Sequence, residues 1–384
     1  MGAVRFDNGG VGRFITRRER DGSLRMGSLY EGVSCFEQLG TREILGWLRE
    51  TDEARLETLF HAADRVRQRA VGDEVHLRGL VEISNRCVRR CAYCGIRVDN
   101  RQITRYRMEE EEILACVRQA VRFGYGTVVL QAGEDPGITR EWMCGLLGQI
   151  KQETPLAITL SLGERSDEDL RAWRQAGADR YLLRFETSDR DLYERIHPAQ
   201  PERASDRFAI LATLRTLGYE VGSGVMIGIP GQGYESLAAD IEAFQRLDLD
   251  MIGVGPFIPH PGTPLGGIGP VTPRGDGEQV PNTEAMTYQV IALTRLVCPF
   301  ANIPSTTALA TLNKETGREL GLQRGANVVM PNLTPPSYRV AYEIYPDKAC
   351  IEETAEHCHL CLSGRIRAIQ RTIGKGQGGR KHRG

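Results

Sequence analysis

From Val81 to Met330, short β-branched hydrophobic runs alternate with longer segments in which hydrophobic residues recur every three or four positions. Runs of the first kind are typical of buried parallel strands, and segments of the second kind are typical of amphipathic helices. We predict strands at 81–84, 127–131, 157–161, 180–186, 220–227, 251–257, 302–305 and 326–330, and helices at 109–123, 140–152, 167–176, 205–217, 235–247, 283–297 and 314–320. Eight strand–helix units predict an α/β fold, namely a complete (β/α)8 barrel of the TIM type.

Two extensions flank the predicted barrel, which we place at residues 75–335. Residues 1–74 form an N-terminal extension with a helical region at 42–69, and residues 336–384 form a C-terminal extension. From Gly374 onward the chain is rich in Gly, Lys and Arg, a composition typical of a mobile tail. One barrel with appendages therefore accounts for the 384 residues without a second domain.

The overall charge argues against nucleic acid or an anionic membrane as a partner. The chain has 49 Lys and Arg residues and 50 Asp and Glu residues, and broad electrostatic binding requires a sustained basic excess. No run approaches about 18 uninterrupted apolar residues, and the N-terminus lacks the apolar block of an export signal. We expect a soluble, cytoplasmic protein whose partners are small molecules or other proteins.

Ten cysteines in such a protein favour metal or cluster ligation, because the cytosol keeps thiols reduced. Six of them fall into two groups, which are Cys87, Cys91 and Cys94, and Cys350, Cys358 and Cys361. The other four are scattered, and we interpret them as small core residues: Cys35, Cys116, Cys144 and Cys298.

The first cysteine group follows the first predicted strand, at the carboxyl end where barrel enzymes place their active sites. Cys87, Cys91 and Cys94 can hold three irons of a [4Fe-4S] cluster and leave the fourth iron open for reaction. A zinc knuckle is the alternative, but this loop has no fourth Cys or His close by. We therefore expect the three cysteines to be cluster ligands with a catalytic role.

Polar side chains alternate with hydrophobic ones along the predicted strands. The alternation directs Arg184 and Glu186 into the barrel, together with Thr159 and Ser161, while Gln131 ends the second strand. Unpaired buried charges are costly, so Arg184 and Glu186 are candidates for ligand binding. A structural ion pair between these two residues is the alternative.

The spacing C-x3-C-x2-C, with Tyr93 before the last cysteine, resembles the radical S-adenosylmethionine (SAM) superfamily. The resemblance implies that the three cysteines bind a [4Fe-4S] cluster. SAM then chelates the open iron and is reductively cleaved to methionine and a 5′-deoxyadenosyl radical. It also implies that Tyr93 lies near the adenine and that the loop from Gln131 contacts the amino group of SAM. In that loop Gly133 and Glu134 match the superfamily, whereas Ala132 replaces a more usual Gly or Ser.

Longer runs between about 79 and 381 resemble the HydE family of [FeFe]-hydrogenase maturases. They include 91–97, 130–136, 160–164, 178–184, 255–261 and 302–307. The resemblance implies that four further residues contact SAM, namely Ser161, Glu186, Arg207 and Met226. It implies that the anion-binding end of an internal cavity is formed by Thr159, Arg184, Thr306 and Thr307. Such a set suits a substrate with a carboxylate, although helix capping is the alternative for the last two threonines.

The second cysteine group matches an accessory iron–sulfur site, [2Fe-2S] or [4Fe-4S], that some HydE relatives carry. Zinc bound with the help of His357 or His359 is the alternative. The resemblance further implies an iron-bound, cysteine-derived substrate supplied by the maturase HydG, transfer of the product to the scaffold HydF, and an electron donor such as reduced ferredoxin or flavodoxin. The alternatives are a biotin-synthase-like or methylornithine-synthase-like enzyme, or a non-catalytic iron–sulfur or zinc-binding protein.

Overall fold

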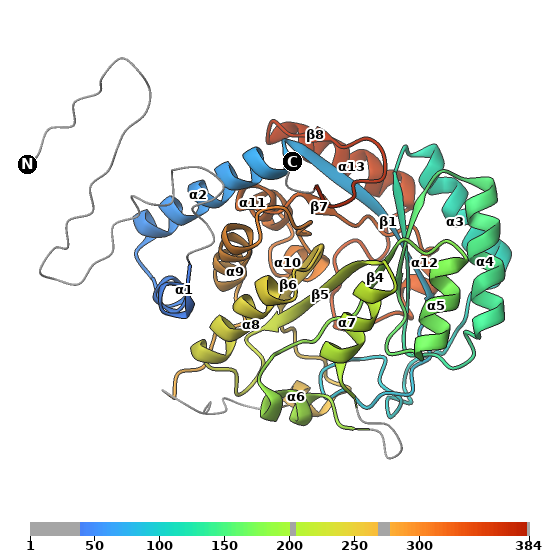
Figure 1. Ribbon diagram of the computed structural model, residues 1–384, viewed down its shortest axis with the longest axis horizontal. Coiled ribbons are helices and arrows are strands. Elements are labelled where there is room, and N and C mark those ends of the chain that lie inside the picture. The colour runs from blue at the N-terminus through green and yellow to red at the C-terminus, as the bar shows by residue number, and fades with distance from the viewer. Residues whose placement is uncertain (1–38, 200–204, 268–276, 382–384) are drawn as a thin grey trace, which may run out of the picture.

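The computed structural model describes residues 39–199, 205–267 and 277–381 (Figure 1). Within these ranges seven parallel strands form one curled sheet in the order β6-β5-β4-β3-β2-β1-β7. The strands are β1 (Glu74–Ser84), β2 (Thr127–Ala132), β3 (Ala157–Ser161), β4 (Arg180–Leu182), β5 (Glu220–Ile227), β6 (Met251–Pro256) and β7 (Val328–Val329). The predicted α/β class with a curled parallel sheet is thus confirmed.

Helices connect the strands and cover the outer face of the sheet (Figure 1). They are α3 (Glu110–Arg122), α4 (Arg140–Glu153), α5 (Asp167–Gln175), α6 (Arg190–Ile196), α7 (Arg207–Thr216), α8 (Tyr234–Arg246), α9 (Glu284–Val297), α10 (Thr307–Leu312) and α11 (Gly317–Gln323). Six of the seven predicted helices agree within two residues at each end. Thr139, Ser166 and Thr283 fix the starts of α4, α5 and α9, because each side chain accepts a hydrogen bond from the backbone N–H three residues later. The short helices α6 and α10 were not predicted.

The segment predicted as a strand at 302–305 is not a strand in the structure. Asn302 makes one parallel bridge to Met251 on β6, and Pro304 makes another to Val328 on β7. Proline has no N–H to donate, so a continuous ladder cannot form through Pro304. The two edges of the seven-stranded sheet are therefore linked only by these isolated bridges.

The N-terminal extension contains the predicted helical region as two helices, α1 (Thr41–Leu48) and α2 (Glu53–Val71). Asp52 separates them, because its side chain accepts from the N–H of Arg55 and caps α2. Both helices pack against α9, and α1 also packs against α8. In the part of the chain that the structure describes, no helix is long and apolar enough to span a membrane.

Three of the four scattered cysteines lie in or against the hydrophobic core as free thiols. Cys116 is fully buried, and Cys144 and Cys298 are partly buried against the core. These positions confirm their interpretation as small core residues. Cys35 lies outside the described residues.

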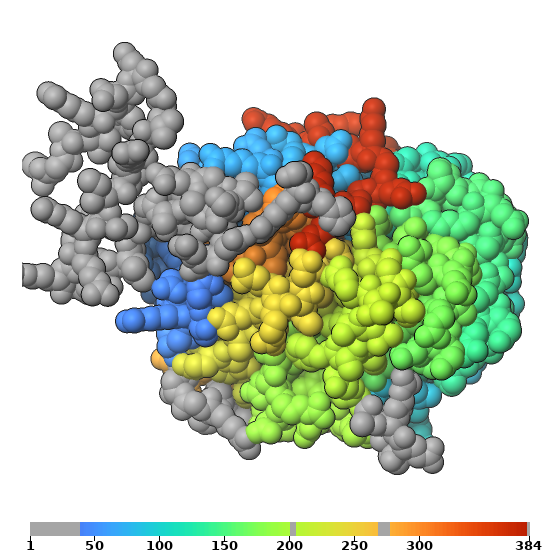
Figure 2. Space-filling view, in the orientation of Figure 1, coloured from blue at the N-terminus to red at the C-terminus, as the bar shows by residue number. Residues whose placement is uncertain are grey.

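The C-terminal extension contains α12 (Pro336–Arg339), α13 (Ala355–Ala368) and the short strand β8 (Thr372–Ile373), which pairs with the start of β1. The prediction of a mobile tail from Gly374 is wrong as far as Lys381, because this segment crosses the amino ends of the strands and bonds to them. In the space-filling view the red C-terminal residues lie against the yellow and yellow-green residues of the sheet region (Figure 2). Residues 382–384 lie outside the described residues.

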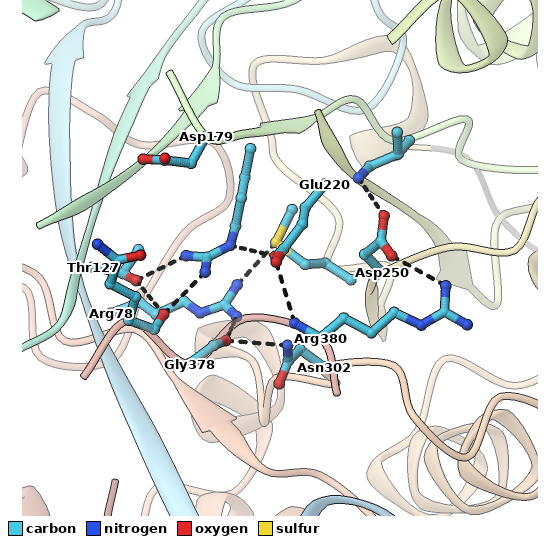
Figure 3. Close-up of polar contacts among 12 residues, drawn as sticks. Arg78, Thr127, Asp179, Glu220, Asp250, Asn302, Gly378 and Arg380 are labelled. Atoms are coloured by element: carbon cyan, nitrogen blue, oxygen red, sulfur yellow. Dashed lines mark hydrogen bonds and ion pairs between the residues drawn. The ribbon is translucent and has the colours of Figure 1, made fainter. Parts of the chain in front are cut away.

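Backbone carbonyls of the tail serve as acceptors at the amino end of the sheet (Figure 3). The Gly378 carbonyl accepts from Arg78 at 2.9 Å and from Asn302 at 3.3 Å. The Gln377 carbonyl accepts from Arg180 at 3.0 Å. The tail glycines that predicted mobility instead allow close approach, because a Cβ on Gly374 would lie 2.4 Å from Nδ1 of His76 and one on Gly378 would lie 2.7 Å from the same ring.

Candidate functional site

A cavity of about 360 Å³ lies inside the curled sheet and reaches its carboxyl end. All fourteen residues predicted for the site line this cavity. They are Cys87, Cys91, Tyr93, Cys94, Gln131, Gly133, Thr159, Ser161, Arg184, Glu186, Arg207, Met226, Thr306 and Thr307. Residues that the sequence separates by more than 200 positions therefore line one cavity.

The loop between β1 and α3 carries the first cysteine group. Arg105 organises this loop, since its guanidinium donates hydrogen bonds of 2.6–3.1 Å to four backbone carbonyl groups. The acceptors are the carbonyls of Asn85, Ile96, Arg97 and Asn100. This one side chain thus supplies hydrogen-bond donors to backbone carbonyls that have no partner in a helix or sheet, because the loop is irregular.

The three thiols of this loop form a donor set that suits a cationic centre. Burial raises the pKa of Cys91 to about 12, and burial together with Cys91 and Cys87 raises the pKa of Cys94. The sulfur of Cys87 accepts backbone N–H groups from Arg89 and Glu134, both at 3.4 Å. Each thiolate would disfavour ionisation of the other two, and cationic irons that replace the three protons would relieve this repulsion. The donor set therefore fits an iron–sulfur cluster.

Gly133 brings the β2 loop directly onto the cysteine loop. A Cβ at this position would lie 2.3 Å from the carbonyl oxygen of Arg86 and 2.8 Å from the Cβ of Cys87. Any other side chain at position 133 would therefore push the two loops apart. The match of Gly133 to the superfamily motif thus has a steric reason in this chain.

A buried chain of ion pairs lies behind the cysteines. Arg89 bonds to Glu134 at 2.9 Å and to Glu164 at 2.6 Å, and Glu164 also accepts from Arg207 at 3.0 Å. Burial opposes the ionisation of Glu164, but Arg207, Ser205 and Arg89 outweigh it and lower the pKa of the carboxyl. The sequence analysis gave no role to Arg89 or Glu164. No local pattern reveals this network, because its partners lie more than 40 residues apart.

Glu186 has a strained backbone at the rim of the cavity. Its φ is 63°, a conformation that costs a non-glycine residue roughly 1–3 kcal/mol and is often found at functional sites. Its carboxylate accepts from Arg184 at 3.1 Å and from the Tyr93 hydroxyl at 3.5 Å. The Arg184–Glu186 ion pair, our alternative for these residues, is therefore present, yet both side chains also face the cavity.

Threonines supply hydroxyl groups to another part of the wall. Thr159 is 2 % exposed, and its hydroxyl has no hydrogen-bond partner among the described residues. An unpaired buried hydroxyl costs about 1–3 kcal/mol, which a ligand can recover. Thr306 caps α10 by accepting from the N–H of Leu309 at 3.3 Å, so the capping alternative is confirmed for that residue. Thr307 is the first residue of α10.

The C-terminal extension adds cavity residues that the sequence analysis missed. Lys348 forms a buried ion pair with Glu82 and lies over the ring of Tyr342 at 5.3 Å. The Tyr342 hydroxyl accepts from the side-chain amide of Gln131 at 3.3 Å, and Tyr345 also lines the cavity. These residues escaped prediction because the extension carries no periodic signal that would dock it against the sheet.

The second cysteine group lies on the extension, outside the cavity. A hydrogen bond between the two thiols raises the pKa of Cys350 and lowers that of Cys358, whereas Cys361 is exposed. His359, a ligand in the zinc alternative, stacks on Phe123 with the ring centroids 4.6 Å apart. Among the described residues, neither cysteine group already has the arrangement of a finished metal site.

Comparison with known proteins relates the chain to one superfamily. Residues 81–244 match the family model described as the Radical SAM superfamily. The chain is 44% identical over 342 residues to the [FeFe] hydrogenase maturase subunit HydE of Thermotoga maritima, covering 89% of this chain and 94% of the relative. It is 29% identical over 294 residues to 3-methylornithine synthase of Methanosarcina acetivorans, covering 76% and 79% respectively.

Solved structures show the same architecture. The crystal structure of methylornithine synthase superposes with a TM-score of 0.73 at 26% identity, covering 88% of this chain and 95% of the other. The crystal structure of HydG, described as a maturase of the [FeFe]-hydrogenase, superposes with a TM-score of 0.71 at 18% identity, covering 88% and 73%. The second likeness shows the fold alone.

Proposed function

Since this chain belongs to the HydE family of radical SAM enzymes, we propose that its cavity binds SAM beside a [4Fe-4S] cluster and acts on a precursor of the hydrogenase diiron subcluster. The observation that carries this proposal is the convergence of Cys87, Cys91 and Cys94 with Glu186 and Arg207 on one cavity. The chain is an enzyme of [FeFe]-hydrogenase maturation, and its exact substrate is part of the proposal.

In this proposal the three cysteines hold the cluster, which supplies the electron that cleaves SAM. Glu186 binds the amino group of SAM, because its carboxylate pairs with Arg184 and faces the cavity. Arg207 keeps N–H groups free for the SAM pocket, since Glu164, His197 and one backbone carbonyl take only three of its five. Tyr93, Gln131, Gly133, Ser161 and Met226 complete the SAM pocket.

Substrate binding is proposed for Arg184 and the threonines Thr159, Thr306 and Thr307. A guanidinium beside hydroxyl groups matches the carboxylate of an iron-bound, cysteine-derived precursor. The hydroxyl of Thr159 supports this assignment most directly, because it is buried and has no hydrogen-bond partner among the described residues.

The proposal also covers closure of the barrel, the accessory cluster and the partner proteins. The bridges of Asn302 and Pro304 support closure of the sheet into a complete (β/α)8 barrel within 75–335, flanked by the extensions 1–74 and 336–384. The contact between Cys350 and Cys358 supports an accessory cluster that Cys361 completes. We also propose a cytoplasmic enzyme that receives its precursor from HydG and delivers its product to HydF.

Anaerobic reconstitution tests the main proposal. The full chain, loaded with iron and sulfide and then reduced with dithionite, should convert SAM to 5′-deoxyadenosine, which chromatography quantifies. A folded, cluster-loaded protein that yields no 5′-deoxyadenosine would contradict the assignment.

The accessory cluster has its own test. Changing Cys358→Ala should lower the iron content per chain while SAM cleavage continues at a similar rate. Equal loss of cleavage in Cys358→Ala and in a ligand variant of the first group would show that the two sites are not separate. An unchanged iron content would show that the second group holds no iron.

A further inference from the structure

Basic residues are concentrated on the cysteine loop. Residues 86–107 contain seven arginines, no lysine and a single carboxylate, Asp99, although the whole chain has a net charge of −1. This segment contains the three proposed cluster ligands. The excess of positive charge therefore lies on the segment that carries the proposed cluster ligands.

Three of these arginines already have partners within the protein. Arg89 pairs with buried carboxylates, Arg105 binds backbone carbonyls of its own loop, and Arg107 pairs with Asp135 at 2.7 Å. These three guanidinium groups already have acidic or carbonyl partners, and their contacts stabilise the fold of the loop. The surface excess must come from the other four arginines.

The remaining four arginines share one carboxylate of the loop. Asp99 pairs with both Arg90 and Arg97, the latter at 2.8 Å. Arg86 and Arg101 are exposed, and their side chains form no hydrogen bond or ion pair with any residue that the structure describes. Two long cationic side chains with no partner are not needed to hold the loop together.

Two acidic residues lie beside Arg86. Arg86 shares a surface hollow with Glu109 and Glu110, at the start of the neighbouring helix α3. Glu109 is already engaged in the capping box of that helix. These carboxylates offset part of the positive charge of Arg86 without forming an ion pair with it.

An apolar patch accompanies these charges. Val88 and Val98 are each 39% exposed, and they are two of only six large hydrophobic residues exposed in the described part of the chain. The N–H of Val98 donates to the carbonyl of Arg89 at 2.9 Å, so the two turns that carry these valines are adjacent. Exposed hydrophobic side chains within an arginine rim are typical of protein docking sites.

We propose that this cluster-loop surface, formed by Arg86, Val88, Arg90, Val98 and Arg101, docks a small acidic electron-transfer protein that carries a reduced flavin. The proposal rests on the proposed function, because a cluster that cleaves SAM must first gain one electron, which the donor loses. Cys87 is partly exposed in the same loop, so a protein docked here would be separated from the cluster by little more than one side chain. Opposite charges would speed the encounter without requiring a large interface.

A double charge reversal tests this surface. Arg86→Glu with Arg101→Glu reverses two charges that hold no partner, so the fold and the cluster should be retained. With reduced acidic flavodoxin as the only reductant, the KM for flavodoxin in SAM cleavage should rise at least about tenfold. The wild-type rate should fall as salt is added, and that salt dependence should weaken in the variant.

Dithionite supplies the internal control, because a small reductant needs no docking surface. The double variant should cleave SAM with dithionite at the wild-type rate and contain the wild-type amount of iron. A matched variant, Arg171→Glu with Arg246→Glu, makes the same charge change on exposed positions of α5 and α8 and should leave the KM for flavodoxin unchanged.

The outcomes separate this proposal from the proposed function. An equal KM for flavodoxin in the two double variants would overturn the docking site, as would a loss of dithionite-driven cleavage in Arg86→Glu/Arg101→Glu at normal iron content. If the wild-type protein produced no 5′-deoxyadenosine with either reductant, the proposed function itself would fail.

Discussion

At the amino end of the sheet, Arg78 and Arg180 donate to the backbone of the chain's own tail, whereas at the carboxyl end Arg184 and Glu186 face a cavity. Both ends bury arginines beside carboxylates. At the amino end the tail from Gly374 to Lys381 supplies acceptors for the arginines (Figure 3). At the carboxyl end Arg184 donates to the carbonyl of Val225 at 2.6 Å, but in the middle of β3 the hydroxyl of Thr159 is left without a partner among the described residues.

The difference teaches how to distinguish a structural polar cluster from a ligand site. Buried polar groups require partners wherever they lie, since each unmatched group costs about 1–3 kcal/mol. A cluster whose partners come from the chain contributes to stability. A cluster that keeps free groups facing an enclosed cavity is prepared for a ligand. Changes at the amino end should therefore lower stability, whereas changes at the carboxyl end should lower activity. Four predictions test this difference, from the largest expected effect to the smallest.

Removal of a thiol at each end should separate function from stability most strongly. Cys91→Ala removes a proposed cluster ligand, so 5′-deoxyadenosine formation should fall at least about 10³-fold, equivalent to about 4 kcal/mol of barrier. Cys298→Ala, which removes a partly buried thiol near the tail residue Arg380, should leave the rate unchanged. The two rates are compared at equal protein concentration. Similar losses of 5′-deoxyadenosine formation in both variants would contradict the assignment of catalysis to the carboxyl end alone.

Removal of the tail should have the opposite effect, lowering stability while SAM cleavage is retained. A chain that stops at Ile373 loses the acceptors of Arg78 and the ion pairs of Arg380 with Asp248 and Asp250, so the free energy of unfolding should fall by roughly 3–5 kcal/mol. Denaturant titration measures this change. SAM cleavage by the fraction that remains folded should persist, because the cysteine loop is untouched.

A point variant covers the case in which the truncated chain does not fold. Gly126→Ala places a Cβ against the carbonyl of Gly376 and should displace the tail, with a smaller loss of stability than truncation. Gly148→Ala in α4 has no atom within 4 Å of the added Cβ and should be neutral or slightly stabilising. Equal stability of the two variants would show that the tail does not hold the amino end.

The same substitution at the two ends should change different measurements. Glu186→Gln removes the charge proposed to bind the amino group of SAM, so the KM for SAM should rise about 10- to 150-fold, the equivalent of a charged hydrogen bond of about 1.5–3 kcal/mol. Glu220→Gln weakens the bond to Arg180 at 2.5 Å and should lower the free energy of unfolding by about 1–3 kcal/mol. A raised KM in Glu220→Gln would contradict the assignment of the amino end to structure.

Much of the fold was predictable because the hydrophobic pattern is local. β3 and β5 match their predictions residue for residue, and alternation along 180–186 correctly directed Arg184 and Glu186 to the cavity. β4 nevertheless ends at Leu182, and Glu186 beyond it has a positive φ and makes only an isolated bridge to Val225 among the described residues. Strain of this kind depends on surrounding contacts, which no local pattern contains.

The tail and the cavity residues of the extension were not predictable for a different reason. A Gly- and Arg-rich sequence has the same composition whether it is mobile or fills a narrow polar space, and the choice depends on the acceptors and carboxylates that it meets. Arg380 is ordered by Asp248 and Asp250, more than 120 residues away. Lys348 likewise finds Glu82 on β1. Such long-range pairs become visible only when the strands are in place.

Acid should weaken the two ends unequally. Burial, followed by Arg207 and Arg89, lowers the pKa of His197 to about 3, and its Nε2 accepts from Arg207. Since the unfolded chain binds this proton near the ordinary value of about 6.5, the contribution of His197 is complete above that pH and is lost as pH falls toward 3. The loss should be about 1 kcal/mol between pH 7 and 5.5. Burial also lowers the pKa of His76 at the amino end.

Two histidine variants measure this difference in denaturant titrations at pH 7 and 5.5. His197→Gln keeps a group that can accept from Arg207 but cannot be protonated, so the free energy of unfolding should depend less on pH than in the wild type. His76→Gln should reduce the dependence in the same direction and by less, because His76 is only partly buried whereas His197 is 2% exposed. If His76→Gln reduced the pH dependence more than His197→Gln, protonation of the histidine beneath the tail would cost more than protonation of the one beside the proposed SAM pocket. That result would contradict the prediction.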